Sequence, residues 1–321
     1  MKEKIFNTAI LLVTICASSA VNAQANYPSR PIRFLVGVVP GGAADTLARA
    51  IGQRYSSAFN QQVIVDNRPG ANQTIATDLT ARAAPDGYTI VIVAAGHAIS
   101  PALYKLPYDV EKDFSAIGFI AAVPNVLVVH TGLGVRTARD FIALARSKPG
   151  AFAYGSSGIG SASHLSTELF QMMTDLKLVH IPYKGQSLAM IDLIAGQLQC
   201  GFPSVPASIQ HIKSGKMIAL GVASKERSSA LPDVPPIDQA VPGYEVSGWY
   251  GVLGPAKLPP AIVARLNGEL NRILRDPATR EILSREGADP LPRTPADFAQ
   301  TISTDIVKWA KVVRAAGLKV E

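Results

Sequence analysis

Two glycine- and serine-rich segments have the composition of anion-binding loops. The first, VPGGAAD, covers residues 39–45, and the second, YGSSGIGSASH, covers residues 154–164. Each follows an apolar run and precedes a helical pattern, so each is predicted to join the carboxyl end of a strand to a helix N-terminus. Unpaired N–H groups, the positive end of the helix dipole and glycines that allow close approach suit a carboxylate or a phosphate. The predicted contacts are Val39, Gly41, Gly42, Ala43, Ser156, Ser157, Gly160, Ser161 and His164.

The same segments fit catalytic motifs poorly. Ile159 replaces the last glycine of a G-x-S-x-G nucleophile elbow, and residues 158–163 lack the third glycine of a dinucleotide fingerprint. Neither segment carries a P-loop lysine, so no cofactor is expected. A secreted hydrolase that uses Ser157 or Ser161 with His164 remains the main alternative. A serine helix cap and a packed imidazole also explain this spacing.

Three further polar residues lie at predicted strand-to-helix junctions. His97 and Lys184 each follow a predicted strand and precede a helix, where either could meet an anionic ligand. A solvated surface position is an equally good interpretation of both. Asp45 lies in the first turn of its helix, where an acid stabilises the dipole, and we prefer this role to that of a catalytic base.

Composition excludes several classes of protein. The chain has 321 residues, a net charge of +7, 48% hydrophobic residues and 17% charged residues, which is unlike a disordered or coiled-coil protein. Its Lys and Arg residues are dispersed, whereas nucleic-acid binding needs a basic patch, so no nucleic-acid partner is expected. Two cysteines and five widely spaced histidines predict neither a disulfide scaffold nor a metal site.

Residues 1–23 have the pattern of a cleaved secretory signal peptide. Lys2 and Lys4 precede an apolar segment at residues 5–17, and cleavage is expected after Ala23. That segment is shorter than the roughly 20 residues that span a bilayer, which disfavours a retained anchor. The protein is therefore expected to be exported.

Apolar runs and helical periodicities alternate along the rest of the chain. Strands are predicted at residues 31–38, 62–66, 88–94, 125–130, 152–155, 179–183 and 217–223, and helices at 43–58, 77–84, 138–147, 163–174, 186–195, 259–274 and after 294. This alternation predicts an α/β fold with mostly parallel sheets. Because no long linker is present, two domains would have to share two or more crossing strands, with a ligand between hinged lobes.

The last helix has a clear beginning and an apolar stripe. Thr294 and Asp297 have the spacing of a capping box. The stripe is more typical of core packing than of a cofactor site. It comprises Phe298, Ile302, Ile306, Trp309 and Val313.

Further motifs run from Tyr27 to the C-terminus. They include YPSRPIRFLV, PGGAADTLAR, AAPDGYTI, YGSSGIGSASHL, HIPYKGQSLAMIDLIAGQLQ and GYEVSGWYGVLGPA. In type and order they resemble the Bug (TctC) family of periplasmic solute-binding proteins of tripartite tricarboxylate transport systems. Taken together they are specific, although no single one would be.

The resemblance implies a periplasmic binding protein-like (Venus flytrap) fold. We place domain I at residues 24–123 plus 247–321 and domain II at residues 124–246. The implied function is to capture a small organic carboxylate in the periplasm, without chemistry, and to deliver it to membrane permease subunits; we expect a monomer. The family's clamping loops correspond to residues 38–44 and to part of 156–164. This adds Val38 and Ser204 to the predicted contacts and places His97 and Lys184 near the cleft.

The chain departs from the family pattern at three places. Gly37 and Val38 stand where the family has proline and an aromatic residue, and PGANQTIA at 69–76 replaces a glycine-rich run. Pro203 stands where the family often has an acid, which disfavours recognition of an ammonium group and hence of amino acids. Dicarboxylates, tricarboxylates and aromatic acids all remain open. So does a role as the ligand-sensing partner of a membrane kinase.

Overall fold

The structure is a computed structural model that describes residues 27–41, 43–70, 73–183, 185–285 and 287–318. The expected signal peptide and the predicted contacts Gly42 and Lys184 lie outside the described residues. Tyr27 is buried, and its hydroxyl donates a hydrogen bond to the carbonyl of Gly87. The described chain is therefore anchored in the fold from its first residue.

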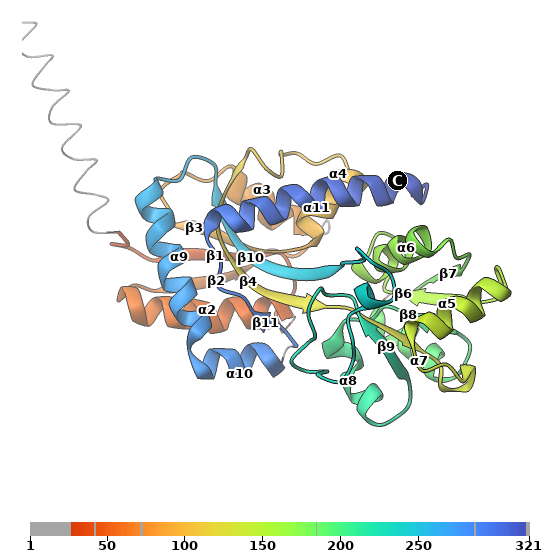
Figure 1. Cartoon of the computed structure of the whole chain (residues 1–321). Coiled ribbons are helices and arrows are strands. Elements are labelled where there is room, and N and C mark those ends of the chain that lie inside the picture. The colour runs from red at the N-terminus through yellow and green to blue at the C-terminus, as the bar shows by residue number, and fades with distance from the viewer. Residues whose placement is uncertain (1–26, 42, 71–72, 184, 286, 319–321) are drawn as a thin grey trace, which may run out of the picture.

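A six-stranded sheet forms what we call the first lobe (Figure 1), with the order β11-β4-β10-β3-β1-β2. Its strands are β1 (Ile32–Val36), β2 (Val63–Asn67), β3 (Thr89–Ala94), β4 (Phe114–Pro124), β10 (Ser247–Pro255) and β11 (Asp289–Pro290). Its helices are α2 (Ala43–Phe59), α3 (Thr74–Ala81), α4 (Gly96–Leu103), α9 (Pro260–Arg275), α10 (Pro277–Arg285) and α11 (Pro295–Ala315). In β1, Phe34 and Leu35 belong to apolar clusters on opposite faces of the sheet. Because both faces are covered, this strand is a continuous apolar run.

A five-stranded sheet forms the second lobe, with the order β7-β6-β8-β5-β9. Its strands are β5 (Val126–Val129), β6 (Ala153–Ser156), β7 (Val179–Pro182), β8 (Cys200–Gly201) and β9 (Ile218–Val222). Its helices are α5 (Ala138–Ser147), α6 (Ala162–Thr174), α7 (Gln186–Ile194) and α8 (Val205–Lys213), with short 3₁₀ turns η2 (Thr131–Leu133) and η3 (Ile237–Gln239).

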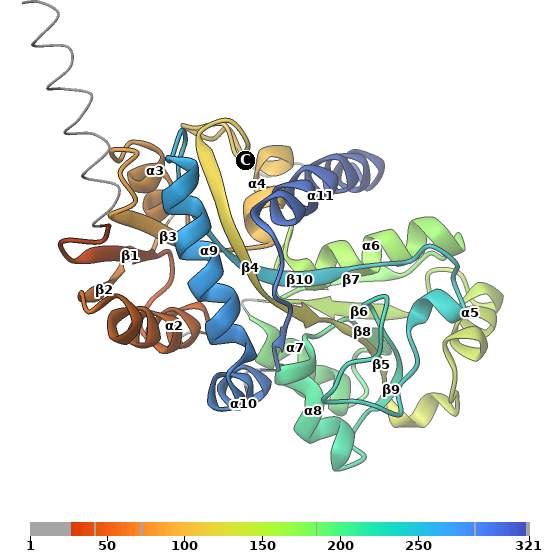
Figure 2. The same cartoon turned by 60° about the vertical axis from the view of Figure 1, so that its left-hand side comes forward.

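Two long strands connect the lobes. β4 leads into β5 of the other sheet after Asn125, and the chain returns along β10, which pairs antiparallel with both β4 and β3. Both views show β4 and β10 running from the first lobe toward the second (Figures 1 and 2). The prediction of mostly parallel sheets is wrong, because five of the nine pairings among the described strands are antiparallel. Strands that carry the chain out and back must run in opposite directions. The domain boundaries stay a prediction.

Helix α11 spans both lobes. The predicted capping box of Thr294 and Asp297 is confirmed. Phe298 near its start packs in the first lobe, whereas Trp309 near its end packs with residues of α6 in the second. In Figures 1 and 2 the helix accordingly passes along α4 and ends beside α6. The apolar stripe is core, as predicted, but it serves two cores.

Candidate ligand-binding site

The first loop, residues 37–41, connects β1 to α2 and is held by a buried aspartate. Asp45 is 2% exposed, and its carboxylate accepts hydrogen bonds from the N–H of Gly41 and from Arg49 Nε, both at 2.9 Å. Asn67 Nδ2 donates to Asp45 Oδ1 at 2.9 Å and to the carbonyl of Val38 at 3.0 Å. Asp45 therefore positions the loop from the first turn of α2.

The charge of Asp45 limits which loop groups can bind an anion. Burial would raise the pKa of Asp45, but hydrogen bonds from Arg49, Gly41 and Asn67 outweigh it and hold the pKa below its usual value. The N–H of Gly41 is therefore committed to an internal carboxylate. A ligand is left with N–H groups such as that of Ala43, which have no carbonyl of an earlier turn to bind.

Gly37 lies against Gln73, so two of the departures from the family pattern meet in space. A Cβ at Gly37 would lie 2.5 Å from the Cβ and 2.9 Å from the Cα of Gln73. Gln73 has a left-handed φ of 71° as the N-cap of α3, and its side chain makes no capping hydrogen bond. A side chain at position 37 and one at position 73 therefore exclude each other.

We expect Gly37→Ala to lower the free energy of unfolding by about 1–3 kcal/mol, because the new methyl group overlaps Gln73. Gln73→Gly should remove the overlap with the side chain of residue 73, although not the 2.9 Å approach to its Cα, and should suit the positive φ, so Gly37→Ala should cost less stability in the Gln73→Gly background than in wild type. Urea unfolding of all four proteins measures the coupling. Simple additivity of the two substitutions would contradict the contact.

The second loop, residues 157–161, connects β6 to α6 and is organised by serine hydroxyls. Buried Ser163 Oγ accepts from the N–H of Ser157 at 3.0 Å and lies 3.2 Å and 3.1 Å from the hydroxyls of Ser157 and Ser161. Ser161 is the N-cap of α6, and its hydroxyl donates to the carbonyl of Gly158 at 2.7 Å. Ser157 and Ser161 are partly exposed. The hydroxyl of Ser157 can therefore turn from Ser163, and that of Ser161 from the carbonyl of Gly158, to an incoming carboxylate.

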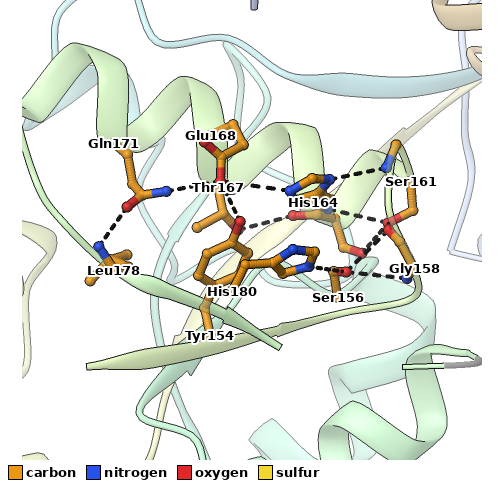
Figure 3. Close-up of polar contacts among 12 residues, drawn as sticks. Tyr154, Ser156, Gly158, Ser161, His164, Thr167, Glu168, Gln171, Leu178 and His180 are labelled. Carbon is orange, nitrogen blue, oxygen red and sulfur yellow. Dashed lines mark hydrogen bonds and ion pairs between the residues drawn. The ribbon is translucent and has the colours of Figure 1, made fainter. Parts of the chain in front are cut away.

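Two other predicted contacts lie behind this loop rather than on it (Figure 3). Ser156 is 0% exposed, and its Oγ lies 2.7 Å from Nε2 of His180. His164 is 1% exposed, and its Nδ1 accepts from the N–H of Gly160 at 3.0 Å. The two imidazole rings stack with centroids 3.9 Å apart and an interplanar angle of 10°. Ser156 and His164 thus support the loop from within the second lobe.

Burial makes both imidazoles poor proton acceptors. It lowers the pKa of His164 to about 4, with the field of His180 as a smaller cause, and it also lowers the pKa of His180. The neutral form is favoured because the interior cannot solvate an imidazolium.

This geometry does not favour the hydrolase alternative. His164 Nδ1 accepts from a backbone N–H, and the hydroxyls of Ser157 and Ser161 bond to other groups. A Ser156–His180 pair does exist, but its hydroxyl is inaccessible to a substrate. The cap and packed imidazole that the spacing also predicted are what the structure contains.

His97 and Ser204 have different surroundings. His97 is 7% exposed, its Nε2 lies 3.0 Å from the carbonyl of Val110, and burial lowers its pKa to about 4. Its ring packs edge-on against Phe114. These contacts favour a packing role over direct ligand contact. Ser204 is partly exposed as the N-cap of α8, and its side chain makes no capping hydrogen bond, so it is available to a ligand.

The second loop touches the first lobe directly. A Cβ at Gly160 would lie 2.5 Å from Cδ1 of Leu103, the last residue of α4. Helix α4 follows β3, which is the parallel neighbour of β1, so α4 and the first loop extend from the same edge of the sheet. The structure thus brings the second loop to the edge that bears the first.

Two apolar side chains are exposed at the loop tips; Val39 was predicted as a contact and Ile159 was not. Val39 in the first loop is 62% exposed and Ile159 in the second is 53% exposed. Exposed large apolar residues near a polar site suit a ligand with an apolar portion. Ile159 was noted only as a break in a catalytic motif. His180 was also missed, because the ring that it stacks on is distant in sequence.

A cavity of about 660 Å³ lies beside β11, the outermost strand of the first sheet, and is a competing location for the ligand. It is lined by Asp289 of β11, Arg280 of α10, Lys308 of α11 and residues 224–229 of the second lobe, and by none of the predicted contacts. Ser229 donates a short hydrogen bond to Asp289 there and joins the lobes. A binding experiment must therefore separate this rear cavity from the two loops.

Within the described ranges, no three His, Cys, Asp or Glu side chains gather in a way that could hold a metal ion. Nor does any helix there combine the length and apolarity needed to cross a membrane.

Comparison with known proteins places the chain among solute receptors. The profile described as "Tripartite tricarboxylate transporter family receptor" matches residues 47–318. Protein BugT of Bordetella pertussis is 35% identical over 319 residues, which cover 97% of each chain. An R. palustris protein solved with adipate is 34% identical, with a TM-score of 0.76, and covers 92% of this chain and 100% of its own.

A second solved structure is similar at lower identity. MatC from Rhodopseudomonas palustris, with bound malate, is 30% identical, with a TM-score of 0.71, and covers 89% of this chain and 100% of its own. The profile and BugT each match most of the chain. The chain therefore belongs to the TctC family of tripartite tricarboxylate transporter receptors, which bind solutes and are not enzymes.

Proposed function

We propose that this protein captures a small organic carboxylate in the periplasm, after removal of residues 1–23, and presents it to membrane permease subunits. The first lobe is proposed to be residues 24–123 plus 247–321 and the second residues 124–246. The ligand would lie between the first and second loops, and closure would follow from contacts to both lobes. Ligand-bound relatives with adipate and malate support the ligand class.

The observation that carries this proposal is the arrangement of the second loop. It presents the partly exposed hydroxyls of Ser157 and Ser161 and the N-terminus of α6, while Gly160 lies against α4 of the other lobe. Charge-assisted hydrogen bonds of this kind contribute about 1.5–3 kcal/mol each. A few of them, after the cost of immobilising the ligand, are consistent with micromolar affinity, about −8 kcal/mol.

The exposed loop tips favour a dicarboxylate with an aliphatic spacer. Val39 and Ile159 could cover methylene groups, and each buried methylene contributes about 0.8 kcal/mol. Adipate should therefore bind more tightly than malate. Calorimetric titration of both acids tests this order, and malate as the stronger ligand would remove the apolar tips from the site.

The first loop is tested by Gly41→Val. Gly41 has a φ of 86° and no atom within 4 Å of a Cβ, so valine fits sterically but strains the backbone. We expect carboxylate affinity to fall below detection, at least about 100-fold, because more than 2.7 kcal/mol is lost as the loop and its hydrogen bond to Asp45 rearrange. The thermal midpoint should fall by several degrees, because backbone strain and the lost hydrogen bond to buried Asp45 each lower stability, but the protein should remain folded.

Arg280→Gln is the matched control, since Arg280 lines the rear cavity and is exposed. If Arg280→Gln abolished binding and Gly41→Val did not, the ligand site would be the rear cavity.

The neighbouring genes distinguish a transport role from a sensory role. Genes for permease subunits beside this gene would support transport, whereas a sensor kinase gene without permease genes would oppose it.

A further inference from the structure

We propose that His164 holds the second loop in its carboxylate-binding shape through its unprotonated Nδ1, and that the stacked His180 keeps this nitrogen unprotonated in acid. Both are positioning residues, and the inference builds on the proposed function because it assigns a proton-linked control to the same loop. It concerns groups that a ligand does not touch.

The hydrogen bond at Gly160 determines which form of His164 the loop requires. The N–H of Gly160 donates to Nδ1 at 3.0 Å, so Nδ1 carries no hydrogen and the neutral ring is protonated at Nε2. An imidazolium would place a second N–H opposite the N–H of Gly160. One proton therefore turns this contact from attraction into repulsion and frees Gly160, which lies against Leu103 of the first lobe.

The loop can tolerate a proton on His180. Its Nε2 lies 2.7 Å from Ser156 Oγ, which also lies 3.1 Å from the carbonyl of Gly158. If Nε2 of His180 is unprotonated, Ser156 donates to it; if it is protonated, it donates and the hydroxyl turns to the carbonyl. Both arrangements keep Ser156 bonded. Protonation of His180 therefore leaves this end of the loop intact.

The stacking couples the two sites. With ring centroids 3.9 Å apart, two imidazolium charges repel strongly, so the first proton taken up by the pair opposes the second. His180 is partly exposed and His164 is buried, which favours His180 as the first acceptor. A charged His180 then protects Nδ1 of His164.

Of the other groups around the pair, Glu168 acts against this effect, but burial and the field of His180 outweigh it and keep the pKa of His164 low. Tyr154 on β6 stacks on His180 at 4.8 Å, and burial and Glu168 raise its pKa, so it stays neutral. Glu168 Oε1 lies 3.7 Å from His164 Nε2, too far for a hydrogen bond, and already accepts from Tyr154 and Gln171. From α11, apolar side chains pack against α6.

The sign of the pH dependence follows. The pKa of His164 lies at about 4 in this structure, below the 6.5 of an unperturbed histidine. A loop released from its packing takes up protons more readily, so acid favours release. The intact loop is fully favoured above pH 6.5, and it is progressively lost as the pH falls from there through about 4.

Matched variants separate the hydrogen bond from the charge. His164→Asn keeps an oxygen acceptor near the Nδ1 position but cannot titrate, whereas His164→Leu has no acceptor. At pH 7.5 we expect adipate affinity near wild type in His164→Asn and at least about tenfold weaker in His164→Leu. Between pH 7.5 and 5, His164→Asn should show only the adipate's own titration, and wild type a steeper loss.

His180→Gln tests the protective role, because glutamine can still bond Ser156 but carries no charge. The acid midpoint of adipate binding should rise by about half a pH unit or more relative to wild type. A midpoint that stays in place or falls would overturn the role of His180.

A measurement on the ligand-free protein keeps this inference separate from the proposed function. Amide hydrogen exchange at Gly160 should be at least about tenfold faster in His164→Leu than in wild type or His164→Asn. Unchanged exchange in His164→Leu would overturn the inference even if adipate binds. Absence of carboxylate binding to wild type at pH 7.5 would overturn the proposed function while leaving the exchange result to decide the inference.

Discussion

Replacing Gly160 with alanine is expected to weaken carboxylate binding about 10- to 100-fold while the protein remains folded. Gly160 has a φ of 74°, and a left-handed conformation costs an L-residue about 1–2 kcal/mol. The new methyl group would also lie 2.5 Å from Cδ1 of Leu103, across the contact between the second loop and α4. Calorimetry with adipate measures the loss.

Two controls identify the cause. Gly134 has a φ of 71° but no atom within 4 Å of a Cβ, so Gly134→Ala imposes the same backbone strain away from both loops. It should lower stability slightly and leave affinity unchanged. Leu103→Ala removes the colliding side chain, so the double variant with Gly160→Ala should recover part of the affinity. Equal losses in Gly160→Ala and Gly134→Ala would show that the contact between the lobes is irrelevant.

Gly251→Ala should give the largest loss of stability, about 3 kcal/mol or more. Gly251 lies on β10, and its Cβ would meet Cζ of Phe298 at 2.1 Å and two further ring atoms within 2.7 Å. The ring is fully buried at the start of α11, so neither the strand nor the helix can move freely, and overpacking of this kind costs at least about 1–3 kcal/mol. Urea unfolding monitored by circular dichroism measures the change.

Gly268→Ala is the matched control for this substitution. Gly268 lies inside α9 with nothing within 4 Å of a Cβ, so alanine should raise stability by about 0.5–1 kcal/mol. The double variant Gly251→Ala, Phe298→Leu should be more stable than Gly251→Ala, because leucine vacates the space of the ring. A Gly251→Ala protein as stable as wild type would mean that Phe298 does not pack on β10.

Features that depend on near neighbours in the sequence could be predicted well. The capping box at Thr294 is confirmed because it needs only Asp297, three residues away. Helix α2 begins at Ala43, as predicted, and its acid Asp45 lies in the first turn. Ser161 is the N-cap expected from its position. Such features depend on local hydrogen bonds and on the period of buried residues, and both can be inferred from the types and spacing of residues in the sequence.

Strand β10 could not be predicted, because its composition is typical of a loop. Its sequence SGWYGVLGP contains three glycines, and glycine is disfavoured in strands. At each of them a Cβ would meet another atom at 2.9 Å or less. Close approach of distant segments selects glycine here, against local propensity.

The roles of the histidines show the same division. From the sequence, His164 is a polar residue beside a glycine loop, which suggests ligand contact. In the structure its Nδ1 bonds Gly160 and its ring stacks on His180, sixteen positions along the chain. Residue order was therefore enough to locate the two loops and the α/β elements that end in them. Which polar groups face the ligand and which hold the loop was decided by tertiary packing, because buried donors and acceptors must first satisfy one another.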